Sequence, residues 1–145
     1  MLKRFYYRAT HKPDGSYFNP LAHIFFYITF VFGVAFTFFG NTETVKHAVL
    51  FTESTKQFGP WALSAWGVCA MIVTLWNTYT IVARKPSYGP ALLGFALWMY
   101  AVLIYAMGDF YFQILVAAVP NLLFWGWWYI RTRRYITWYR THLSP

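Results

Sequence analysis

Side chains able to do chemistry are scarce in the long apolar stretches of this sequence. Of the residue types Asp, Glu, Lys, Arg and His, only His23 falls inside one of them. A membrane haem ordinarily takes two axial ligands from facing helices, and no second histidine is placed to oppose His23. Zinc or di-iron catalysis lacks ligands as well, because no His and Glu stand a helical turn apart in these stretches. We therefore predict no cofactor, no metal and no enzymatic activity, and interpret His23 as an interfacial or packed histidine.

Cys69 is the single cysteine of the chain, which excludes an internal disulfide. Membrane enzymes that exchange thiols and disulfides need paired cysteines, so that class is excluded too. We expect Cys69 to be a small, buried residue within a helix bundle. Glycine-rich phosphate loops and the G-x-S-x-G elbow of serine hydrolases are missing from the sequence.

Uncharged polar side chains remain, and the main candidates are Asn77, Gln113 and Asn121. In a membrane such groups form hydrogen bonds between helices, at about 0.6 kcal/mol each, or they line a narrow polar path. We favour the first role. Pro120, next to Asn121, is expected to bend its helix, because its ring removes one backbone hydrogen bond that a polar neighbour can replace.

Small residues spaced four positions apart indicate faces where two helices approach closely. Gly33 and Thr37 form one such pair, and Ala65 and Cys69 form a looser one. Because each pair lies in a different apolar stretch, both stretches are predicted to offer a face for helix packing.

The elements that carry these residues are predicted to be membrane-spanning helices in an all-α fold built of helical hairpins. Four stretches contain no Asp, Glu, Lys or Arg, namely 15–42, 57–83, 86–108 and 110–130. About 20 helical residues cross a bilayer core of about 30 Å, so each stretch is long enough. We place the four spans near 21–39, 61–83, 89–107 and 111–130, within a transmembrane domain of 21–130. Only 11% of the residues are charged, against about 25% in soluble domains, which agrees with this class.

The distribution of charged residues predicts which segments lie on each side of the membrane. With an even number of spans, the N-terminal tail (1–20), the loop after the second span and the C-terminal tail (131–145) share one side. These segments hold ten of the twelve Lys and Arg residues and one acid, Asp14. The other side holds two lysines and three acids: Lys46, Lys56, Glu43, Glu53 and Asp109. Basic residues near span ends stay in the cytoplasm, so we predict that both termini are cytoplasmic. A plasma or inner membrane is expected, with an organelle membrane as the alternative.

Aromatic and basic residues mark the ends of the spans. We expect Trp61 and Trp66 in the outer interfacial belt, and the Trp-rich end of 111–130 in the inner belt. The segment 44–53 is predicted to form a short surface helix, and 131–141 a helix along the inner surface that binds anionic lipid or a partner protein. That surface comprises Arg131, Arg133, Arg134, Tyr135, Trp138 and Arg140. Because topology explains the positive charge, nucleic acid is not expected as a partner.

The leading interpretation is a non-enzymatic structural or accessory subunit that packs against lipid and against other membrane subunits or copies of itself. It follows from the lack of catalytic groups rather than from a motif. A holin-like, self-assembling pore former is the alternative, because holins are small, hydrophobic, multi-span proteins that often end in a basic tail. A channel or a lipid- or pigment-binding protein that uses the polar residues of the second and fourth spans is a third hypothesis.

Overall fold

The computed structural model describes residues 1–12, 19–40 and 42–142, in which the regular elements are helices. Within these ranges, four helices are long and apolar enough to cross a bilayer: Pro20–Phe38 (α2), Trp61–Val82 (α5), Gly89–Met107 (α6) and the continuous run Tyr111–His142. The first three contain 19, 22 and 19 residues, which corresponds to about 28–33 Å at 1.5 Å per residue. The predicted all-α fold with four candidate spans is confirmed for the described residues.

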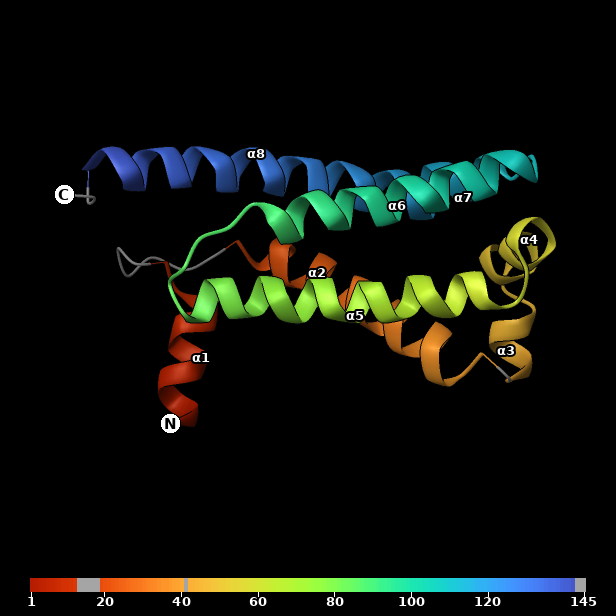
Figure 1. The fold of residues 1–145 in the computed structure, drawn as a ribbon, viewed down its shortest axis with the longest axis horizontal. Helices are drawn as coiled ribbons and strands as arrows, with labels where there is room; N and C mark the ends of the chain where they lie inside the picture. Colours follow the sequence, from red (N-terminus) through yellow and green to blue (C-terminus); the bar gives the residue numbers. More distant parts are fainter. Residues whose placement is uncertain (13–18, 41, 143–145) are drawn as a thin grey trace.

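The fourth span is longer than predicted. It begins as α7 (Tyr111–Gln113), passes through a π-helical turn (Ile114–Ala118) and continues as α8 (Val119–His142). Its 32 residues extend about 48 Å, so the rod is longer than a bilayer core. The segment 131–141, expected as a separate helix along the surface, instead continues α8 in line (Figure 1). No Gly or Pro follows Gly126 until the end of α8, so nothing in the sequence stops the helix there.

The four long helices form two layers that lie against each other. α2 and α5 make one layer and α6 and α8 the other, and α5 and α6 join the layers (Figure 1). The backbones of α2 and α8 scarcely meet, so large side chains fill the space between them. Two buried polar side chains, Thr29 and Asn77, contact the tryptophan rings of the bundle interior.

The connection 41–60 contains two helices where one was predicted over 44–53. They are α3 (Glu43–Lys46) and α4 (Val49–Phe58), and extended backbone at Ala48 separates them. α4 packs on α5 and α6 and buries Leu50 and Ser54, so it covers the end of the bundle rather than lying free on the surface. Gly59 ends α4 with φ +96°, a conformation that glycine adopts without strain.

A further helix lies in the segment that was expected to be an N-terminal tail. α1 (Leu2–Thr10) contacts α5 and runs almost perpendicular to the four long helices (Figure 1). The rest of the predicted tails includes 13–18 and 143–145, which lie outside the described residues. The N-terminal helix and the C-terminal end of α8 lie at the same end of the bundle.

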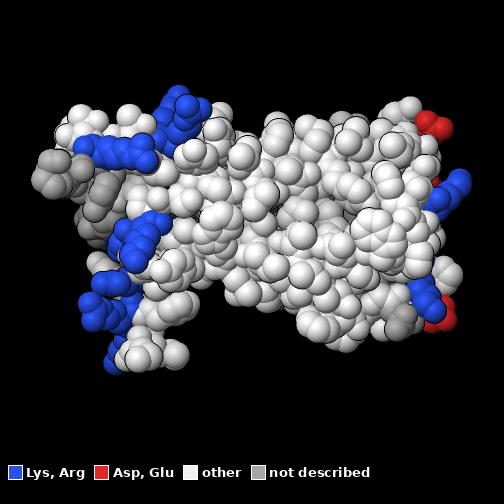
Figure 2. Space-filling view, viewed as in Figure 1, with Lys and Arg blue, Asp and Glu red and all other residues white. Residues whose placement is uncertain are grey.

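Charged side chains occupy the two ends of the molecule and leave its middle bare. On the face shown in Figure 2, Lys and Arg gather at the end that carries α1 and the last turns of α8. The visible Asp and Glu side chains lie at the opposite end, near the α6–α7 turn and near α3, together with a smaller amount of Lys. An uncharged band of this kind is typical of a protein surface that faces lipid.

Candidate functional site

The interior of the bundle has a polar centre that sequence reasoning missed. Thr29 of α2 is fully buried (0% exposed), and its hydroxyl oxygen accepts hydrogen bonds from the indole N–H groups of Trp98 (3.0 Å) and Trp125 (3.1 Å). The two rings come from α6 and α8, so one hydroxyl joins three helices. A buried indole N–H needs an acceptor, which is the signal that could have pointed from the tryptophans to a threonine.

Asn77 forms a second polar contact between helices. Its side-chain oxygen accepts a hydrogen bond from the indole N–H of Trp128 at 3.0 Å, which joins α5 to α8. The amide nitrogen Nδ2 of Asn77 is buried and has no hydrogen-bond partner among the described residues. The carbonyl oxygen of this side chain is thus used between helices, as the packing hypothesis expects.

Asn121 and Gln113 do not join this contact. The Asn121 amide donates to the carbonyl of Ala117 in its own helix at 2.7 Å, and Pro120 precedes it directly after the π-helical turn. The interruption expected from Pro120 therefore takes the form of a π turn with a side-chain hydrogen bond beside it. Gln113 ends α7, about 22 Å along the rod from Trp128, too far to share a polar path with Asn77.

Glycines on α2 and α5 bring these two helices into close contact. A Cβ atom placed on Gly67 would lie 2.8 Å from the carbonyl oxygen of Gly33 and 2.5 Å from Oγ1 of Thr37. The Gly33 and Thr37 face therefore meets α5 at Gly67, whereas Ala65 and Cys69 are exposed. Two positions along a helix correspond to about 200° of rotation, so Ala65 and Cys69 face away from the contact that Gly67 makes. Cys69 is thus not the buried residue that was expected.

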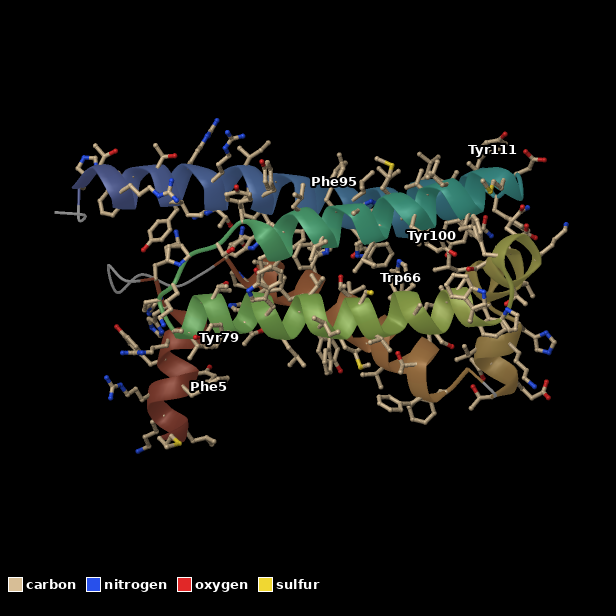
Figure 3. All side chains as sticks on the ribbon, in the orientation of Figure 1. Phe5, Trp66, Tyr79, Phe95, Tyr100 and Tyr111 are labelled. Carbon is tan, nitrogen blue, oxygen red and sulfur yellow. The ribbon has the colours of Figure 1, made fainter. Side chains whose placement is uncertain are left out.

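Several tryptophans assigned to the interfacial belts belong to the core. Trp66 is 4% exposed, lies between α5 and α6 (Figure 3) and donates to the carbonyl of Leu97 at 2.8 Å. Trp125 and Trp128 are also buried, and Phe26 of α2 packs against both of them. Trp61, by contrast, is exposed as a belt residue would be. The helical phase of each ring, rather than its distance from the span end, decides which rings point inward.

The last turns of α8 present the predicted basic and aromatic surface. The Arg131 guanidinium lies 5.2 Å from the centre of the Trp127 ring, Arg133 donates to the Tyr129 hydroxyl at 3.5 Å, and Trp138 stacks on His142. Tyr135 stacks on Trp138, while Arg134 and Arg140 are exposed. A shallow recess of about 400 Å³ runs along this part of the helix and is lined by Tyr129, Ile130, Arg133, Arg134 and Thr137. Guanidinium groups beside exposed rings suit an anionic headgroup.

Three threonines of α5 use their hydroxyl groups within their own helix. Thr74, Thr78 and Thr80 donate to backbone carbonyls of α5. Among the described residues no group of three or more His, Cys, Asp and Glu side chains is placed to hold a metal ion.

Comparison with known protein families, with curated proteins and with solved structures finds no match to this chain.

Proposed function

We propose that this protein is a non-enzymatic, multi-pass membrane protein that serves as a structural or accessory subunit, packing its outward helix faces against partner membrane proteins and lipid. The observation that carries this proposal is the division between the inner and outer faces of the spans. Inward faces hold polar side chains, and Thr29 and Asn77 use theirs on neighbouring helices. Outward faces are apolar, and only 28–39% of the most apolar part of each span is buried within the molecule.

The outward face of α5 illustrates the division. Val68, Ile72 and Leu75 are exposed on it, together with the small residues Ala65 and Cys69. Small residues let another helix approach closely, and large apolar residues around them add contact area. The same face fits lipid chains, so the face itself supports both the subunit role and the lipid contact.

Both termini are assigned to the cytoplasm in this proposal. The basic end of the bundle carries α1, the α5–α6 loop and the last turns of α8, and positively charged segments stay on the cytoplasmic side. We place the protein in a plasma or inner membrane, with anionic lipid at the Arg131–Arg140 surface of α8. Green fluorescent protein fused at either end should fluoresce in bacteria, and alkaline phosphatase inserted after Glu43 should be active. Active phosphatase at either terminus would contradict the orientation.

Photo-crosslinking in native membranes tests the subunit role. A small diazirine-bearing amino acid at Val68, which is 40% exposed, should yield a discrete crosslinked product with another membrane protein. Val73, on the inward face of the same helix at 2% exposed, is the matched control and should crosslink only within the chain. Lipid adducts alone at Val68, together with recovery as a monomer in mild detergent, would refute the subunit role.

Self-assembly into a holin-like pore is the second candidate, favoured by the exposed pair of small residues on α5. If copies meet there, mild oxidation in membranes should join Cys69 of one copy to Cys69 of another, and Ala65→Trp should abolish this product. Abrupt leakage of the inner membrane on expression is the further requirement for a pore. Crosslinked dimers without leakage would indicate a homo-oligomer that is not a holin.

A further inference from the structure

α1 is an amphipathic helix with no basic residue on its apolar face. Leu2, Phe5, Tyr6 and Ala9 recur at intervals of three and four residues and share one side of the helix. The basic residues Lys3, Arg4 and Arg8 fall on the remaining arc, and α1 contains no acid. Leu2, Phe5 and Tyr6 are exposed, so the apolar face of α1 is not covered by the rest of the described chain.

The position of α1 relates this face to the plane of a bilayer. The helix lies across the basic end of the bundle, almost perpendicular to the spans, and extends beyond the side of α5 (Figure 1). Phe5 and Tyr79 lie in the corner between α1 and α5, on the side of α1 toward the spans (Figure 3). Lys and Arg atoms in this region are on the opposite side of α1, away from the spans (Figure 2). A bilayer around the spans would thus meet the apolar face of α1 at its surface.

A contact with α5 holds α1 at this level, and a local ring stack orders the C-terminal end of α1. The Arg8 guanidinium donates to the carbonyl oxygen of Val82 at 3.4 Å, in the last turn of α5, where backbone carbonyls lack partners within the helix. Tyr7 stacks on His11 with ring centres 4.0 Å apart. The orientation of α1 is therefore set by the end of a span, and its apolar face is presented rather than free to turn.

We infer that α1 is an interfacial helix that docks on the anionic lipid surface of the leaflet at the basic end. Its apolar residues enter the boundary between headgroups and acyl chains, and its lysine and arginines meet lipid phosphates. The inference rests on the membrane orientation proposed above but not on any protein partner. It assigns a lipid-binding role to a segment separate from the α8 surface.

Fluorescent labels on single cysteines of the whole protein in vesicles test the inference. Phe5→Cys and Tyr7→Cys, each combined with Cys69→Ala, make a matched pair, because both side chains are 50% exposed but lie on different faces of α1. The vesicles contain phosphatidylcholine alone or with about one third phosphatidylglycerol. With the anionic lipid, the label at position 5 should be quenched by shallow spin-labelled lipid and about threefold less by iodide than the label at position 7.

Charge variants complete the test. Arg4→Gln should lower the docking equilibrium about fivefold, the equivalent of about 1 kcal/mol per basic residue, whereas Lys56→Gln at the opposite end should leave it unchanged. Equal iodide quenching at positions 5 and 7, or protection at position 5 that ignores lipid charge, overturns the inference, the latter because protein would then cover α1. A label on the native Cys69 should be protected from iodide. If iodide quenches it as strongly as the label at position 7, membrane crossing fails and the inference with it, which distinguishes the two failures.

Discussion

α2 packs against its neighbours on two sides, and the two sides associate in opposite ways. Against α5 it packs through glycines, and the backbones approach so closely that a single added Cβ would collide. Against α6 and α8 it packs through large rings, and Thr29 is the polar point on which Trp98 and Trp125 meet. Lipid chains are as apolar as these side chains, so helix association in a membrane depends on close contact and hydrogen bonds. α2 uses close backbone contact on the side of α5 and hydrogen bonds on the side of α6 and α8.

Removal of the buried indole ring of Trp125 should have the largest effect on stability. Trp125→Ala takes away a fully buried side chain that packs on Gly94 and Phe26, and it should lower the free energy of unfolding by about 3 kcal/mol. Denaturation in mixed micelles measures the change. Trp127→Ala, at the exposed neighbouring ring, is the control and should change little. Equal losses for the two variants would mean that the aromatic contact is not what stabilises this side.

Added side-chain volume in the glycine contact between α2 and α5 should have the second-largest effect on stability. Gly67→Val pushes α5 away from Gly33 and Thr37 and should cost about 2 kcal/mol. Ala65→Val adds volume to the exposed face of the same helix and should cost less than about 0.5 kcal/mol. Thermal stability in detergent, followed by size-exclusion chromatography, ranks the two. A harmless Gly67→Val would show that the two backbones are farther apart than described.

Removing the shared acceptor should have a smaller effect. Thr29→Val keeps the shape of the side chain but leaves two indole N–H groups without their acceptor, so we expect a cost of about 1 kcal/mol. In the Trp98→Phe background the same substitution should cost about half as much, because one of the two hydrogen bonds is already gone. Strict additivity of the two substitutions would contradict a shared hydroxyl.

Asn77→Leu should have the smallest effect. It removes one hydrogen bond between helices, from Trp128, and relieves a buried amide nitrogen that has no described partner, so the expected cost is at most about 0.6 kcal/mol. Asn121→Leu is the companion, because its amide donates to Ala117 in the π-helical turn of the same rod. Conductance measured on both variants also addresses the channel hypothesis, since a change in either would support a polar path through the bundle.

The spans could be read from the sequence because charge is excluded from lipid over a length that the helix rise fixes. The inward faces of the spans could not be predicted from the sequence, since a span surrounded by lipid is apolar on all sides and has no strong periodicity. This is why spacing alone predicts a contact face at Ala65 and Cys69, whereas Gly67 makes the contact with α2. It is also why position alone predicts interfacial belts for Trp66, Trp125 and Trp128, which are buried.

Other features differ in how clearly the sequence indicates them. α1 combines apolar residues at helical intervals with three basic residues, which is the ordinary pattern of an amphipathic helix. The role of Thr29 is harder to foresee, because one threonine among many becomes special only through rings far away in the chain. An asparagine such as Asn77 is an evident polar candidate in an apolar stretch, whereas the hydroxyl of Thr29 is not.

The π-helical turn in the fourth span lets the rod hold one extra residue without changing which rings face inward. A π turn accommodates one extra residue, and one residue corresponds to about 100° around a helix. Deleting a single residue from 114–118 would restore a regular helix and keep 111–113 in the same orientation relative to Trp125 and Trp128. In this rod, a deletion within the turn is therefore expected to be less damaging than a deletion from the regular part of α8, which would rotate one side of the rod by that angle.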